Sequence, residues 1–139
     1  MLVNTEIKFN TRGSGDIIDI TSSLKDAVAV SEINSGIVVV FSPSATSALT
    51  TIEYEPGLLD DLPEFLEKII PSNKAYHHDK TWHDGNGFSH LRAALLGPGL
   101  TIPFINKELT LGTWQQVVFL EFDNKARHRT LVVQISGEN

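Results

Sequence analysis

An unbroken apolar run at Gly36–Phe41 constrains the fold of this chain more than any other segment. Four consecutive residues at its centre, Ile37 to Val40, are β-branched. Such residues favour strands, and a continuously apolar strand is typical of a position buried on both faces of a sheet. The run therefore predicts a central strand. It is far too short to cross a bilayer, so we expect no membrane partner.

Further strands are predicted on both sides of this run. Residues 2–10 alternate between apolar and polar side chains, which is typical of a half-buried strand. The same kind of pattern, bounded by turn residues, predicts strands at 16–20, 48–54, 101–105, 110–111, 115–122 and 129–135. The last two are joined by a turn at 123–126.

Two main helices are predicted between these strands. The first begins at a cap on Ser22 or Ser23 and runs to about Asn34. The second carries apolar side chains at helical spacing over 58–69, with Asp60 or Asp61 as its N-cap.

A shorter helix is predicted at 91–96, closed by Gly97. Strands outnumber helices and do not alternate regularly with them. This order favours an α+β fold with mostly antiparallel pairing, in one compact domain covering 1–139.

Composition excludes several classes of function. The formal net charge is −6 with Lys and Arg scattered, whereas nucleic-acid binding requires a basic stripe. The absence of cysteine excludes thiolate chemistry and Cys-type zinc sites. The N-terminus lacks the pattern of a signal peptide, so we expect a cytoplasmic protein.

Histidines gather in one segment. Four of the five histidines in the chain are His77, His78, His83 and His90, and most of them lie in a predicted loop at 72–89. A loop of this length inside a compact domain is usually functional or disordered. Histidine is a common metal ligand and proton carrier, although this spacing does not match helical zinc proteases. Each histidine alone reads as a surface residue, but the cluster favours a site.

Four other side chains are candidates for the same chemistry. Glu53, at the end of a predicted strand, is either an exposed residue or a carboxylate that binds metal or moves protons. Trp114 is either a core residue or a substrate contact, and Gln115 alternates onto the opposite face. Arg129 is either a surface cation or, if buried, a residue that requires a carboxylate or phosphate partner.

The chain resembles the YjbQ-like family along nearly its whole length. The resemblance is carried by Ala45-Thr46-Ser47-Ala48-Leu49, Glu53, Asp61, Tyr76-x-His78-Asp79, Ser89-His90-Leu91, Leu96-Gly97, Ile102-Pro103, Gly112-Thr113-Trp114-Gln115, Glu121 and Arg129. It implies a homotrimer and a His-containing pocket that holds a divalent metal such as zinc or magnesium. It also implies a weak thiamine-phosphate synthase activity, which joins a pyrimidine diphosphate to a thiazole phosphate and releases pyrophosphate.

One position departs from the family pattern. Ser44 stands where the family has a histidine, so only His78 and His90 match the family's histidines as metal ligands. Either His77 or His83 then compensates, or the metal is weakly bound or absent. The resemblance implies catalytic roles for His78, His90, Glu53 and Arg129. The substrate, a small phosphorylated metabolite, would contact Arg129, Gln115, Trp114, Asn86 and Ser44. The alternative is a binding module for a small anionic metabolite whose metal site has degraded.

Overall fold

The computed structural model describes residues 1–139 and contains two antiparallel sheets with four helices. The elements are β1 (Leu2–Asn10), β2 (Ile17–Asp19), α1 (Thr21–Val30), β3 (Ser35–Phe41), β4 (Ser47–Ile52), α2 (Pro56–Ile69), α3 (Asp79–Trp82), α4 (Gly87–Leu96), β5 (Gly99–Ile105), β6 (Glu108–Leu109), β7 (Gln116–Glu121) and β8 (His128–Glu138). The larger sheet has the order β1-β8-β3-β5-β6, and the smaller has β2-β7-β4. Every strand pair is antiparallel, which confirms the predicted α+β class.

The main core lies between the two sheets and α1. β7 supplies Val117 and Phe119 to this core, and it turns Val118 and Leu120 toward a second cluster that includes Leu66 of α2 and Ala93 of α4. Alternate side chains of a strand point to opposite faces, so β7 is the strand that is buried on both sides. It thereby ties the helical layer to the sheets.

The prediction that 36–41 is buried on both faces is wrong. Val38 and Val40 of β3 are fully buried, but Ile37 and Phe41 each keep 42% of their surface exposed. The reason is that α1 and the smaller sheet cover only one face of the larger sheet. Val132, paired with Phe41 across β3 and β8, is 40% exposed on the same uncovered face. We call Ile37, Phe41 and Val132 the outer apolar patch.

Both main helices differ from the prediction at their ends. α1 ends four residues before Asn34, and its N-cap, Ile20, makes no side-chain cap hydrogen bond. α2 begins one turn earlier than predicted because the Glu55 carboxylate accepts from the backbone N–H groups of Gly57 and Leu58. Asp60 and Asp61 therefore lie inside the helix. The Glu55 carboxylate cap followed by Pro56 favours this earlier helix start over a start at Asp60 or Asp61.

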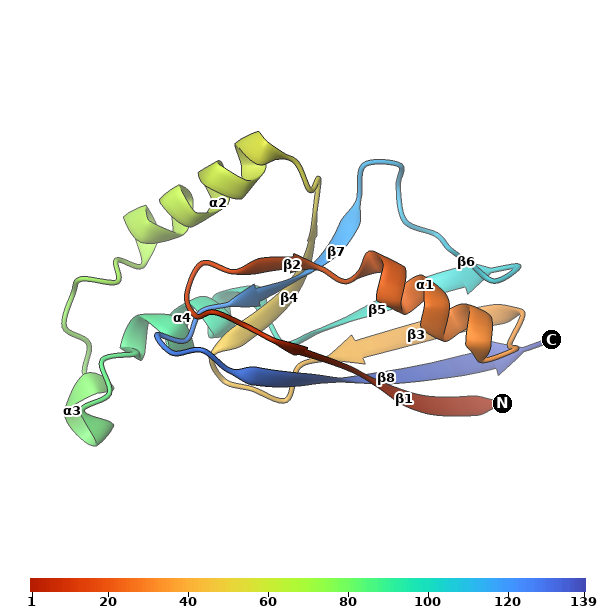
Figure 1. Cartoon of the computed structure of the whole chain (residues 1–139), viewed down its shortest axis with the longest axis horizontal. Coiled ribbons are helices and arrows are strands. Elements are labelled where there is room, and N and C mark those ends of the chain that lie inside the picture. Colours follow the sequence, from red (N-terminus) through yellow and green to blue (C-terminus); the bar gives the residue numbers. More distant parts are fainter.

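Figure 1 shows both chain termini at one end of the molecule and α3 at the other. The predicted loop at 72–89 contains α3 and the first turn of α4, so α4 is longer than the predicted helix at 91–96. None of the four helices is long and apolar enough to cross a membrane.

Candidate functional site

The segment that carries His78 is fixed to the start of α4 by Asp79. The Asp79 carboxylate accepts hydrogen bonds from the backbone N–H of Tyr76 at 3.0 Å and of Gly87 at 2.9 Å. These bonds, the Tyr76 bond first, lower the pKa of Asp79 below its ordinary value. A Cβ on Gly87 would lie 2.6 Å from that of Tyr76, so the two segments pack backbone against side chain. This contact sets the position of His78.

His78 and His90 lie next to each other across this junction. Their ring centroids are 4.2 Å apart and the ring planes are tilted by 46°. The pKa of His90 is lowered, first by burial and then by the nearby His78, while the carboxylates of Asp84 and Asp123 oppose the shift. His90 is therefore mostly neutral near pH 7. The structure thus brings together the two histidines that the resemblance selects.

Two side-chain oxygens face the Nε2 atom of His78. Asn86 Oδ1 lies 3.2 Å from this nitrogen, and Asp84 Oδ1 lies 3.9 Å from it. Asn86 is buried, and its Nδ2 reaches Asp123 Oδ1 at 3.4 Å. The Asp84 Oδ1 atom is shielded from solvent and has no hydrogen-bond partner. A buried carboxylate oxygen without a donor is costly, so this atom marks an unsatisfied acceptor in the site.

Asp123, which follows the end of β7, holds Asn86 in place through a hydrogen bond. Burial pushes its pKa upward, but hydrogen bonds from Arg127 and Asn86 and the charge of Arg127 outweigh that effect, so the pKa is lowered. Arg127 Nε donates to Asp123 Oδ2 at 2.7 Å. Asp123 therefore stays ionised and offers only acceptors to its neighbours.

A second ion pair supports the floor of the site. Arg129 donates to the fully buried Glu121 through Nε at 2.7 Å and Nη2 at 2.5 Å. It also donates to Ser44 Oγ at 2.8 Å and Thr46 Oγ1 at 3.0 Å. Ser44 and His90 line one groove of about 360 Å³, together with Ala45, Ser47, Ala93, Ala94 and Pro98. The anion that Arg129 requires is supplied by the chain itself.

The donors around His78 suit a divalent cation. No three His, Asp or Glu side chains surround one point closely enough to hold a metal ion. The potential donors near His78 are His90, the unpartnered Asp84 oxygen and the amide oxygen of Asn86. Neutral imidazole and oxygen atoms are the ligands that Zn²⁺, Mn²⁺ and Mg²⁺ accept, so these residues fit such an ion.

Glu53, Trp114 and Gln115 lie away from the histidines. Ser47, at the groove, pairs with Glu121, whereas Ile52 at the other end of β4 pairs with Gln116. A six-residue strand spans about 17–20 Å, which separates Glu53 from His90. Trp114 is 71% exposed, and Gln115 Nε2 donates to Thr51 Oγ1 at 3.1 Å. These residues belong to the end of the β4–β7 pair that is remote from the groove.

His77 and His83 are exposed and do not join the pair. His83 ends α3 in the left-handed conformation at a φ of 60°. The residues that the sequence interpretation missed as parts of the site are Asp84, Asp123, Arg127 and Thr46. Glu121 and Asp123 stand two apart at the end of an apolar strand. That spacing places both carboxylates on one side and was the available signal.

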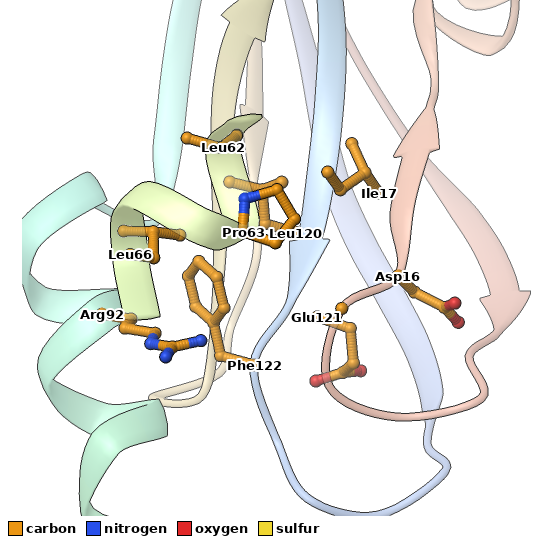
Figure 2. Close-up of a pocket in the computed structure, with 10 residues that line it drawn as sticks. Asp16, Ile17, Leu62, Pro63, Leu66, Arg92, Leu120, Glu121 and Phe122 are labelled. Atoms are coloured by element: carbon orange, nitrogen blue, oxygen red, sulfur yellow. The ribbon is translucent and has the colours of Figure 1, made fainter. Parts of the chain in front are cut away.

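A further cavity lies between α2 and β7 (Figure 2). Leu62, Pro63 and Leu66 face Leu120 and Phe122 across it. Its volume is about 20 Å³, room for about one water molecule. This cavity is too small to hold a metabolite.

Comparisons with known proteins identify one family over nearly the whole chain. The family model described as "UPF0047 protein YjbQ-like" matches residues 5–138. A UPF0047 protein of Archaeoglobus fulgidus is 42% identical over 127 residues, which are 91% of this chain and 97% of that protein. One from Methanothermobacter thermautotrophicus is 40% identical over 133 residues, 96% of this chain and 91% of that protein.

Solved structures share the fold. A YbjQ-like protein of unknown function from Sulfolobus solfataricus has a TM-score of 0.89 at 26% identity, covering 99% of this chain and 100% of that one. An uncharacterised YjbQ/UPF0047 protein from Clostridium acetobutylicum has a TM-score of 0.81 at 34% identity, covering 94% of this chain and 99% of that one.

Proposed function

The chain belongs to the YjbQ-like UPF0047 family, and we propose that it is an enzyme acting on a small phosphorylated metabolite at the pocket around His78 and His90. The reaction that we propose is a thiamine-phosphate synthase reaction. A carbon–nitrogen bond forms between a pyrimidine methylene and a thiazole phosphate as the bond to the diphosphate breaks, and pyrophosphate leaves with the electron pair. The observation that carries the proposal is the 4.2 Å pairing of the two histidines beside a groove.

The charges around the pocket support the proposal that a divalent cation takes part. Asp84, Asp123 and Glu121 carry negative charge there, whereas only Arg127 and Arg129 carry positive charge. With His90 neutral, these three carboxylates outnumber the two guanidinium groups, so the surroundings repel a diphosphate. Zinc or magnesium held by His78 and His90 would reverse this and neutralise the charge of the leaving group.

The chain's own residues then bind and orient the substrate. His90 lines the groove as a neutral imidazole, so it offers one N–H donor to a phosphate oxygen and keeps one lone pair. Arg129, whose charge is paired with Glu121, donates to Ser44 Oγ and so orients this hydroxyl at the groove. Ser44 and Asn86 supply a hydroxyl and an amide for further contacts. Such preorganised donors are the main contribution expected in phosphate chemistry.

We further propose that the protein is a homotrimer in the cytoplasm, where phosphorylated metabolites are made. The outer apolar patch, Ile37, Phe41 and Val132, supports assembly because exposed apolar side chains in the centre of a sheet gain from burial. Glu53, Trp114 and Gln115 can contribute to a pocket only across such an interface. Their catalytic and binding roles are therefore tied to the trimer.

A second function, binding of an anionic metabolite without turnover, is favoured by Ser44 and by the pairing of Arg129 with Glu121. Incubation with both thiamine precursors and Mg²⁺ or Zn²⁺ distinguishes the two. We expect thiamine phosphate and pyrophosphate to form, and His78→Ala to abolish the product while His77→Ala, the adjacent exposed histidine, retains it. Precursor binding by calorimetry with no product from the wild type would favour the binding module.

A further inference from the structure

We propose that the open edge of β1, together with the adjoining side of α1, binds an extended and positively charged segment of a partner protein as an added strand. This site shares no residue with the groove of Ser44 and His90, so it adds to the proposed function instead of resting on it. In strand addition the main chain supplies most of the affinity, and pockets for alternate side chains supply the specificity.

The outer edge of β1 carries a row of free backbone groups. β1 is the first strand of the order β1-β8-β3-β5-β6, so no strand lies on its other side. Met1 and Gly137 exchange backbone hydrogen bonds in both directions, at 3.0 and 3.2 Å. Because antiparallel pairing alternates, the N–H and C=O groups that point away from β8 belong to the even-numbered residues, Leu2, Asn4, Glu6 and Lys8. None of these groups bonds to another segment of the chain, so the edge is a template for one more strand.

A groove of about 440 Å³ runs along this edge. Its volume lies in the range of about 300–1,000 Å³ that small-ligand sites occupy, so it has room for the side chains of a short segment. In Figure 1, α1 lies alongside the N-terminal half of β1. The two elements line the groove with Val3, Asn4, Thr5, Glu6, Ser23, Asp26, Ala27, Val30 and Ser31.

The side of α1 that faces the groove offers one negative charge and one apolar contact. Ser23, Asp26 and Val30 recur at helical spacing, which places them on one side of the helix. Val30 is 81% exposed although it is apolar. Asp26 forms no ion pair, whereas Glu6 of the strand is paired with Lys8 at 3.6 Å. The groove therefore presents an uncompensated carboxylate beside an exposed valine.

The spacing of these two side chains matches that of a strand. Asp26 and Val30 are four residues apart on a helix, which is about 6 Å along its axis. Side chains on one face of a strand are two residues apart, which is about 6.6–6.8 Å. A strand added to β1 therefore places a cation at Asp26 and an apolar side chain at Val30 when these two alternate in its sequence. The net charge of −6 also attracts a basic segment.

A second copy of this chain fits the groove less well than such a partner. The side chains of β1 that turn toward the core and α1 include Val3 and Ile7, with Thr5 between them. None of the three is a cation. If β1 of another copy paired with this edge, its inward side chains would therefore leave Asp26 without a partner.

Titration of the ¹⁵N-labelled full chain with the peptide acetyl-Thr-Val-Thr-Lys-Thr-Val-Thr-amide tests the site. The peptide places Val, Lys and Val on one face of a strand. We expect saturable shifts of the backbone amides of Leu2, Asn4, Glu6 and Lys8, together with slower hydrogen exchange at these four amides. A peptide with Glu in place of Lys should bind at least about tenfold more weakly, because it sets two like charges together.

Two variants separate the backbone from the charge. Asn4→Pro removes an N–H that faces away from β8, so it should weaken binding at least about tenfold while the pairing with β8 survives. Asp26→Lys should exchange the preference, so that the Glu peptide binds more tightly than the Lys peptide. Glu64→Lys is the matched control, because it makes the same change of charge at an exposed position on α2 and should bind as the wild type does.

Three results would overturn the peptide site. They are a wild type that binds neither peptide, an Asn4→Pro variant that binds as the wild type does, and an Asp26→Lys variant that keeps the preference for Lys. Light scattering without peptide supplies a fourth outcome. A mass that falls in Asn4→Pro would show that another copy of the chain occupies this edge, and the partner segment would then be ruled out.

Discussion

The guanidinium of Arg129 forms two hydrogen bonds with the carboxylate of Glu121, which has no exposed surface. Breaking a buried ion pair by removing one partner costs about 3–5 kcal/mol, since a charge is left without compensation. We therefore expect Arg129→Ala to lower the free energy of unfolding by about this amount. Urea unfolding measures it.

The control for this prediction is Arg12→Ala. Arg12 also donates twice to a carboxylate, through Nε and Nη2 to Asp16 Oδ1, but its side chain is 93% exposed. An exposed pair contributes about 0–1 kcal/mol, so the control should stay close to the wild type. Arg129→Lys keeps the charge without the planar fork and should lie between the two. Equal stability of all the proteins would show that the pair adds nothing to the fold.

Gly87→Ala should damage both stability and the site. An added Cβ would lie 2.6 Å from Tyr76 Cβ and 3.0 Å from Asp79 Oδ1, so the segment carrying His78 has to move. Overpacking of this kind costs about 1–3 kcal/mol. Thermal unfolding gives the size of the loss. Gly112→Ala is the control, because its Cβ would meet Gln115 atoms only at 3.7 and 3.8 Å.

Acid should loosen the segment at 76–87 before the rest of the chain. The pKa of Asp79 in the folded protein is lowered by the hydrogen bond from the Tyr76 N–H. Its contribution to stability is therefore complete above the unfolded pKa of about 3.9 and is lost as the pH falls through the folded pKa. Hydrogen exchange of the Gly87 amide, measured below about pH 4, should show loss of protection. In Asp79→Asn this amide should be less protected and should not change over that range.

Ser44→His should tighten zinc binding. Ser44 lines the groove beside His90, so a histidine there restores the family residue next to an existing imidazole. We expect a gain of at least about tenfold, and we expect it to shrink below about pH 6, because a protonated histidine cannot bind metal. Zinc calorimetry measures this, and Ser44→Ala controls for the lost hydroxyl. No gain would mean that oxygen ligands already complete the site.

Charge in the outer apolar patch should prevent assembly. Phe41 and its partner Val132 are 42% and 40% exposed at the centre of the uncovered face. Light scattering of the wild type should give three times the chain mass of 15.3 kDa, and Phe41→Asp should give a single chain. Val30→Asp is the control, because Val30 is an apolar side chain on α1 that is 81% exposed. A monomeric wild type would end the trimer proposal.

The class of the fold follows from local patterns in the sequence. Alternation at 2–10 predicts β1, and helical spacing at 58–69 predicts most of α2. Burial of β3 on both faces was predicted wrongly, because a continuous apolar run looks the same whether its second face meets a helix, another chain or water. The strand that is buried on both faces, β7, is about as apolar in sequence as β3. Only the packing of α2 and α4 separates the two cases.

The site was predictable in part. Two histidines could be selected from the sequence, and they are in contact. Asp123 was indicated only by its spacing from Glu121, and Arg127 by nothing, because their role depends on a hairpin at 122–128 that folds against a loop nearly forty residues earlier in the chain. Glu53 and Gln115 resemble site residues in sequence, yet β4 carries Glu53 away from the groove. A strand predicted from the sequence fixes the order of its residues, but it does not show which end of the strand packs against a distant loop.

The bond between Ser44 and Arg129 joins residues 85 positions apart, and the one between Thr11 and Glu121 joins residues 110 positions apart. At synthesis rates of about 5–20 residues per second, Arg129 emerges from the ribosome roughly 4 to 17 seconds after Ser44. A nascent chain therefore carries both histidines well before it has the ion pair that supports the groove. The pocket is among the last parts of the protein to mature during translation, and a chain cut short before β8 would have the ligands without their support.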